Sequence, residues 1–245
     1  MPRRAWIVLS LASLIAAPAW GFELERVDDR PCSASQNLLW PSASTEVDIS
    51  SLPLLGFQPL GIQAYQRWNS SVPSFQFSSR TGGTPCSLGD GIVSLHLSPT
   101  TCSGDGFGSV LAYTVTRYNT TTGQLTDADV IFNSGMLTSN AVFLEVSMHE
   151  LGHVLGLDHS DACGDSGAGT LMKSTLDFHA TRLDRPQGDD IAGANFIYAE
   201  DSGGGPGLGP VGGNTSCAIG PATRRGSALP LLLLPALLAL WRRAG

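Results

Sequence analysis

A single stretch, HELGHVLGLDH, holds the residues best able to do chemistry. Its first two histidines, His149 and His153, are four residues apart, so on an α-helix they lie on one face and can reach one metal ion. Gly156 can turn the chain out of that helix with positive φ, which would bring His159 back as a third ligand. Three neutral nitrogen ligands and an open fourth position are typical of a catalytic zinc site, where Glu150 can act on a metal-activated water as a general base.

The same stretch matches every fixed position of HExxHxxGxxH, the zinc-binding consensus of the metzincin metallopeptidases, and the chain therefore resembles that superfamily. Ser160 and Asp161, which follow the third histidine, are similar to the residues found there in the matrixins. The resemblance implies a methionine in a tight turn beneath the zinc, and Met172 follows at a suitable interval after a glycine-rich loop. An isolated methionine would otherwise be interpreted as core filler.

The elements that must position this site follow one another in the order of a metzincin-like α+β domain. Alternating or continuous apolar runs predict strands at 46–49, 75–77, 92–97, 110–118 and 130–132. Helical spacing predicts helices at 60–68, at 141–155 with Ser139 or Asn140 as N-cap, and at 189–198. The resemblance implies a mixed, twisted sheet with an active-site helix and a C-terminal helix, within one catalytic domain over residues 22–201.

Residues 106–113 (GFGSVLAY) are similar to the matrixin edge strand beside the active-site cleft. In that family a peptide substrate lies antiparallel to this strand and adds to the sheet through backbone hydrogen bonds. The resemblance therefore places Gly108, Val110 and Ala112 along the bound substrate.

Asp127 and Asp129 resemble the following matrixin strand, which lies near bound calcium. The alternative is that these two carboxylates are solvated at a turn and a strand end. Matrixins also hold a structural zinc through histidines on these two strands, but Tyr113 and Asp129 stand there instead. We therefore do not expect a second zinc, and we expect structural or surface roles for His96 and His179.

The two ends of the chain do not look like parts of the domain. Two arginines, an apolar run and Ala17-Pro18-Ala19 predict a signal peptide over residues 1–19, with cleavage after Ala19 or Gly21. Residues 202–216 have the composition of a Gly/Pro/Ser-rich linker. Residues 217–245 begin with Cys217 and end with an apolar run and two arginines, which resembles a myxobacterial C-terminal sorting tail; an ordinary short anchor is the alternative.

The charge of the domain bears on its partners, and its cysteine content favours export. Between the two end segments lie 21 acidic and eight basic residues, a net charge of −13, which disfavours a nucleic-acid partner and favours bound calcium or basic substrates. Four cysteines in the domain predict two disulfides in an oxidising compartment. Three pairings exist, and the short separation favours Cys86–Cys102, leaving Cys32 with Cys163; a latency thiol is the alternative for Cys32.

These observations predict a secreted or surface-displayed, monomeric zinc endopeptidase that acts on proteins or peptides and meets a membrane only through its tail. Two other classes remain. One is a zinc hydrolase of a non-peptide amide, and the other is a surface module that holds a metal without catalysis. The presence of Glu150 favours an enzyme, and the resemblance to a substrate-binding edge strand favours peptide as the substrate.

Overall fold

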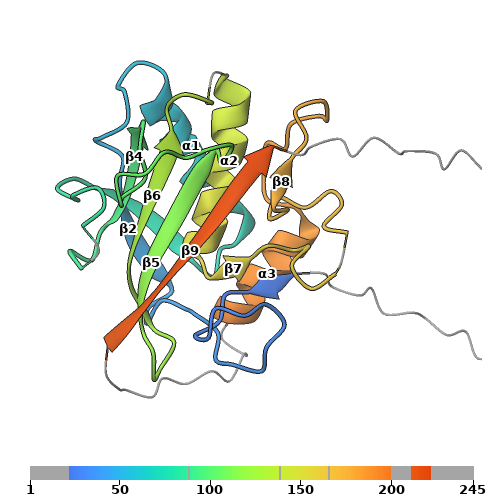
Figure 1. Cartoon of the computed structure of the whole chain (residues 1–245). Coiled ribbons are helices and arrows are strands. Elements are labelled where there is room, and N and C mark those ends of the chain that lie inside the picture. The colour runs from blue at the N-terminus through green and yellow to red at the C-terminus, as the bar shows by residue number, and fades with distance from the viewer. Residues whose placement is uncertain (1–21, 88, 138, 165, 200–210, 222–245) are drawn as a thin grey trace, which may run out of the picture.

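A computed structural model of the chain describes residues 22–87, 89–137, 139–164, 166–199 and 211–221 (Figure 1). The expected signal peptide (1–19), residues 202–210 of the expected linker and residues 222–245 of the expected sorting tail lie outside this part. No helix within the described residues is both long and apolar enough to cross a membrane.

A twisted mixed sheet forms the centre of the fold. Its strands are β2 (Ser44–Asp48), β3 (Gln76–Arg80), β4 (Val93–Ser98), β5 (Ala112–Asn119) and β6 (Leu125–Asn133), extended by β8 (Thr175–Leu176) and β9 (Val211–Pro221). The order across the sheet is β3-β2-β4-β6-β5-β9-β8. β3, β2, β4 and β6 run parallel to one another, whereas β5 is antiparallel to β6. The inner strand β6 is buried at eight of its nine positions, and its buried residues include the polar Asp127, Asp129 and Asn133.

Two long helices pack together beside this sheet, α1 (Phe57–Ser71) and α2 (Asn140–Val154) (Figure 1). The buried face of α1 carries Gly61, Ala64, Tyr65 and Trp68, at the spacing of one helical stripe. Trp68 also donates from its indole N–H to the carbonyl of Met148 on α2 (2.8 Å). This bond fixes the two helices against each other along the part of α2 that carries the histidines.

A third helix, α3 (Gly188–Tyr198), closes the domain below the sheet, and the short strands β1 (Glu23–Leu24) and β7 (Leu157–Asp158) pair beside it (Figure 1). Tyr198 donates its hydroxyl to the carbonyl of Leu155 (2.8 Å) and accepts the backbone N–H of Trp40 (3.2 Å). Trp40 in turn donates its indole N–H to the carbonyl of Val154 (2.7 Å). The last helix thus fixes the end of α2, where the chain must turn toward His159.

The predicted helices and strands are all present, with ends shifted by a few residues. The N-cap of α2 is Ser139, whose hydroxyl accepts the N–H of Val142 (3.2 Å). The predicted edge strand needs correction, because Gly108 and Val110 precede β5. Gly108 has a left-handed φ of +59°, and Val110 donates its N–H back to Phe107 in a turn, so of the three expected substrate contacts only Ala112 lies on β5.

A second correction concerns the expected linker. The composition indicates a linker over residues 202–216, but residues 211–221 form β9, which lies antiparallel to β5 and parallel to β8 (Figure 1). Composition alone did not reveal this strand, because its three glycines and its polar residues lower its apparent β-propensity. The pairing depends on the open edges of β5 and β8 rather than on the segment's own pattern.

Both predicted disulfides are present. Cys86 is bonded to Cys102, and Cys32 to Cys163. The alternative role for Cys32 as a latency thiol is therefore wrong for this structure, since its sulfur is already bonded.

Candidate metal centre

The three histidines of the HELGHVLGLDH stretch converge on one point. His149 and His153 lie on α2 and are fully buried, and His159 follows β7. The Nε2 atoms of His149 and His153 lie 3.1 Å apart. The Nε2 atom of His159 lies 3.3 Å from each of them. Three ring nitrogens from two separate segments therefore face one another across a space of atomic size.

Backbone carbonyls determine which nitrogen of each helical histidine carries the proton. His149 Nδ1 lies 2.8 Å from the carbonyl oxygen of Leu171, and His153 Nδ1 lies 2.7 Å from that of Leu157. A carbonyl oxygen can only accept, so each Nδ1 donates and each Nε2 of the neutral ring is left as a lone pair. Burial lowers the pKa of all three rings, that of His159 to about 3, which keeps them neutral.

This arrangement fits a zinc ion. Neighbouring nitrogens bound tetrahedrally at 2.0–2.1 Å from zinc are separated by about 3.3 Å, which is close to the three distances between these Nε2 atoms. Unprotonated nitrogens at such separations repel one another unless a cation lies between them. The donor set of His149, His153 and His159 therefore matches a three-histidine site with a fourth position left for water or substrate.

The turn that returns His159 to the site depends on Gly156. Its φ is +93°, and a Cβ there would lie 2.3 Å from the carbonyl oxygen of Leu38. Both the backbone conformation and the space therefore require glycine. Glu25 donates its backbone N–H to the Gly156 carbonyl (2.9 Å), which holds the turn in place.

Met172 lies directly beneath the metal-binding helix. It is 2 % exposed, and its sulfur fits against Gly152, where a Cβ would come within 2.2 Å of it. The preceding carbonyl, that of Leu171, is the one that orients His149. The predicted turn therefore supports the site through a backbone acceptor as well as through packing.

Glu150 points toward the sheet rather than away from it. It is fully buried, and its Oε2 accepts the hydroxyl hydrogen of Thr114 on β5 (2.6 Å). Its Oε1 has no hydrogen-bond partner among the described residues. Burial raises the pKa of Glu150 to about 8, against the opposing effect of the Thr114 hydrogen bond. One oxygen is thus held by the sheet and the other is available to a proton.

The matrixin family model matches residues 60–199, which is more than half of the chain. This chain is a matrixin. It is therefore a zinc-dependent metallopeptidase, and the predicted α+β metzincin-like fold is confirmed. No curated protein matches it.

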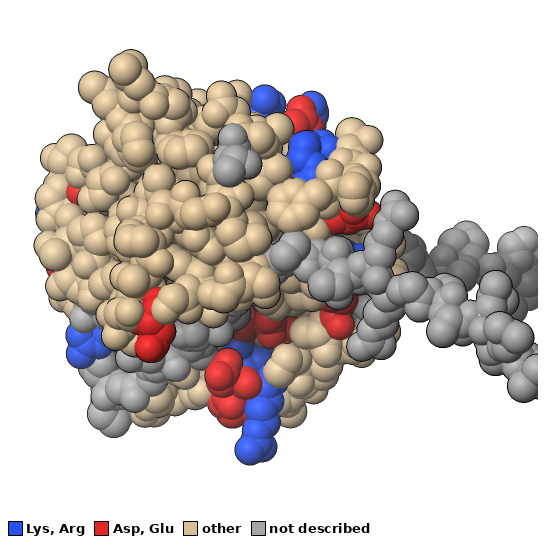
Figure 2. All heavy atoms as spheres, turned by 45° about the horizontal axis from the view of Figure 1, so that its top comes forward, with Lys and Arg blue, Asp and Glu red and all other residues tan. Residues whose placement is uncertain are grey.

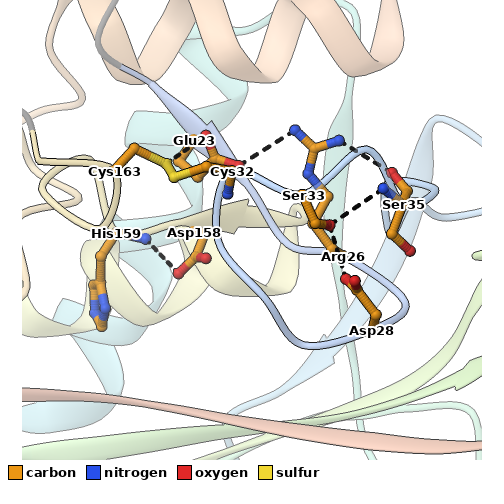
Figure 3. A network of polar contacts seen from close by, with 9 residues as sticks. All are labelled: Glu23, Arg26, Asp28, Cys32, Ser33, Ser35, Asp158, His159 and Cys163. Carbon is orange, nitrogen blue, oxygen red and sulfur yellow. Dashed lines mark hydrogen bonds and ion pairs between the residues drawn. A yellow bond between two sulfur atoms is a disulfide. The ribbon is translucent and has the colours of Figure 1, made fainter.

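Residues 22–40 of this matrixin, upstream of the family match, support the zinc-binding turn from outside. Glu25 is 4 % exposed, and its Oε1 lies 3.4 Å from His153 Nδ1. Figure 3 shows the neighbouring contacts, in which Glu23 accepts from Arg26 (3.3 Å) and from the backbone of Cys32 (3.1 Å), beside the disulfide to Cys163. Sequence reasoning missed Glu25, because nothing in its spacing links it to a helix 120 residues later.

Asp190 is a second supporting residue that sequence reasoning missed. Its carboxylate accepts the N–H groups of Leu171 (2.9 Å) and Met172 (3.1 Å), and also that of Gln187 (2.7 Å), with which it forms a capping box on α3. One acidic residue in the first turn of α3 thus fixes both the helix and the methionine turn. The sequence signal that could have identified Asp190 is its position three residues after Gln187, the N-cap of α3, which is the spacing of a capping box.

A cavity of about 350 Å³ lies beside α2 and is lined mostly by residues 168–183. Its apolar lining includes Leu171, Leu176 and Leu183. Glu145 on α2 and Arg182 also line it and form an ion pair (3.1 Å). The cavity thus combines leucine side chains with an ion pair, and Lys173 and Asp177 also line it.

Asp127 and Asp129 are both buried on β6. Asp127 accepts backbone N–H groups from Gly89, Gly91 and Ala128, so it holds the preceding loop. Asp129 accepts the N–H of Ser94 (3.2 Å), while its Oδ2 has no partner among the described residues; burial raises its pKa to about 7. The interpretation as solvated strand ends is wrong, because neither carboxylate is exposed.

Neither of the remaining histidines belongs to the group of three converging rings. His96 is on β4 and half-buried, with its pKa lowered by burial, and His179 is in an exposed turn after β8. Among the described residues, one further group of three potential metal ligands exists, Glu23 with Cys32 and Cys163, and its cysteines are bonded to each other. Most of the face in Figure 2 is uncharged, and its acidic and basic side chains occur in small mixed groups.

Proposed function

We propose that this matrixin is an exported endopeptidase in which His149, His153 and His159 hold the zinc ion and Glu150 is the general base. The observation that carries the proposal is that three unprotonated Nε2 atoms converge on one point while Glu150, the residue after His149 on α2, provides a buried carboxylate. When bound, zinc supplies a Lewis acid that polarises a carbonyl and lowers the pKa of water.

Glu150 moves the proton in this reaction. Its Oε1 takes a proton from the attacking water and then delivers it to the nitrogen of the leaving amine. Thr114 holds Oε2 and so fixes the carboxylate's plane. Burial raises the pKa of Glu150, which favours the protonated acid that must pass its proton to the amine.

Cleavage within a chain, rather than at its end, is supported by the length of β5. This strand offers backbone groups over eight residues, Ala112–Asn119, and Thr114 places Glu150 near one end of it. β8 lies across from β5 in the same sheet. A peptide between the two is held over a stretch that extends past the scissile bond, which suits an endopeptidase.

Digestion of an unstructured protein tests this proposal. Purified chain should cut casein at internal bonds, as read by mass spectrometry of the fragments. A chelator should stop the reaction, and added zinc should restore it. A zinc hydrolase of a non-peptide amide would release no fragments but would act on an amide screen, and a binding module would do neither.

Calcium is a further part of the proposal. The unpartnered Oδ2 of buried Asp129 supports it, together with the acidic net charge of the domain. Asp127 supports it less, because its oxygens already accept backbone N–H groups. A calcium-dependent rise in melting temperature, lost in Asp129→Asn, is the expected result.

Export and surface display rest on the ends of the chain. The two disulfides suit an oxidising compartment, and residues 1–19 have the pattern of a signal peptide. We propose that Cys217 marks the processing point of a sorting tail and that the enzyme acts as a monomer, attached to a membrane only through that tail. N-terminal sequencing and the intact mass of the exported protein would fix both processing sites.

A further inference from the structure

The position of β9 has a direct bearing on substrate access. β9 pairs antiparallel with the whole of β5, from Ala112 opposite Ile219 to Asn119 opposite Val211. Its last two residues, Gly220 and Pro221, pair in parallel with Thr175 and Leu176 of β8. One segment of eleven residues thus occupies both strand edges that an extended peptide would use (Figure 1).

The register brings β9 to the level of the general base. Thr114, whose hydroxyl is bonded to Glu150, is the register partner of Cys217. Directly opposed residues of antiparallel strands have Cα atoms about 4.5–5.5 Å apart. The segment therefore crosses the cleft beside the catalytic carboxylate.

A strand edge has a single row of backbone donors and acceptors, so it can pair with one partner at a time. We propose that residues 211–221 are a tethered peptide that occupies the substrate cleft of its own chain and excludes other peptides from it. This inference rests on the proposed function, because it takes β5 as the substrate-binding edge. Release of the segment, by cleavage or by displacement, activates the enzyme.

The connection between domain and segment makes such occupancy effective. Eleven residues, 200–210, lie between Ala199, the C-cap residue of α3, and Val211, the first residue of β9. A short tether gives an effective concentration on the order of 1 mM. A segment whose free form binds with a Kd of about 10–100 µM then lowers activity about 10- to 100-fold.

Cross-linking in the full-length chain tests the position of the segment without any activity measurement. In a Cys217→Ser background, Val115→Cys with Ser216→Cys joins two register partners. The matched control, Val115→Cys with Thr215→Cys, joins residues on opposite faces of the ladder, because Thr215 is opposite Thr116. In a glutathione redox buffer, we expect the first pair to form a disulfide at least tenfold faster than the control. Equal rates would overturn the proposal.

Activity is then measured on the same full-length chain before and after a cut in the tether. Residues 203–208 are replaced by the recognition sequence of a site-specific protease, and a fluorogenic peptide reports turnover. We expect the cut to raise turnover about 10- to 100-fold, and a synthetic peptide of residues 211–221, unlike a scrambled one, to reverse the gain. An active chain that gains nothing on cutting overturns the proposal. If the first cysteine pair cross-links selectively but the chain is inactive both before and after the cut, the segment lies where we place it and the proposed function is wrong.

Discussion

Gly152 is the one glycine of the metal-binding helix α2, and replacing it should disturb the zinc site. A methyl group there would lie 2.2 Å from Met172 Sδ and 3.0 Å from its Cε. Trp68 lies 3.3 Å away on another side, and both neighbours are almost fully buried. The sulfur of Met172 must therefore move. Because Met172 directly follows Leu171, this movement would displace the Leu171 carbonyl that orients His149.

Two opposing terms set the size of the effect of Gly152→Ala. Overpacking a buried site costs about 1–3 kcal/mol, whereas replacing glycine by alanine inside a helix stabilises it by about 1 kcal/mol. We therefore expect the free energy of unfolding to fall by about 0–2 kcal/mol. We expect zinc affinity to fall more clearly, by about 10- to 100-fold, because the acceptor of a ligand histidine is displaced.

Urea unfolding and zinc competition with a chromogenic chelator measure these two quantities. Gly188→Ala is the matched control, since it lies on α3 with nothing within 4 Å of the added methyl, and it should leave zinc affinity unchanged. Adding Met172→Ala to Gly152→Ala should restore part of the lost affinity by removing the clash. A Gly152→Ala protein about 1 kcal/mol more stable, with unchanged zinc affinity, would refute the packing of Met172 beneath the helix.

Three further predictions concern other parts of the molecule. Burial raises the pKa of Asp129 from 3.8 to about 7, so its contribution to stability is present below about pH 4 and is lost as the pH rises through 7. In calcium-free buffer, Asp129→Asn should flatten the dependence of the free energy of unfolding on pH between about 4 and 8, and should raise that free energy at pH 8 by at most about 4 kcal/mol. Urea unfolding at several pH values measures this, and equal pH dependence in the two proteins would contradict it. Replacing Cys32 and Cys163 together by serine should destabilise the fold by about 2–5 kcal/mol and weaken zinc binding, seen by calorimetry and chelator competition, whereas unchanged zinc affinity would show that the disulfide does not support the His159 turn. Glu145→Gln with Arg182→Leu removes the ion pair from the cavity, and should shift cleavage of a peptide library toward larger apolar side chains; an unchanged cleavage pattern would exclude this cavity from specificity.

The metal centre could be predicted from the sequence because its ligands are local. His149, His153 and Glu150 are placed by helical periodicity, and His159 by a turn of fixed length after Gly156. The order of strands and helices was equally accessible, since it follows from apolar periodicity along the chain.

What the sequence did not reveal depends on contacts between distant segments. Glu25 beside His153 and Asp190 beneath Met172 are single carboxylates whose roles arise only when the chain has folded. The pairing of β9 with β5 depends on a free strand edge about 100 residues away, and the segment's glycines gave no sign of it. The start of β5 was misplaced because GFGSVLAY continues the apolar pattern through a turn that Gly108 makes with positive φ.

The most direct test of the account is the comparison of the cut-tether chain with its Glu150→Gln variant. Glutamine keeps the shape of the side chain and the hydrogen bond to Thr114 but cannot take a proton. We expect both proteins to bind one zinc per chain with similar affinity, and turnover of a peptide to fall by at least about 10²–10⁴-fold in the variant. Wild-type turnover in the zinc-loaded variant would contradict the role of Glu150 and with it the proposed mechanism.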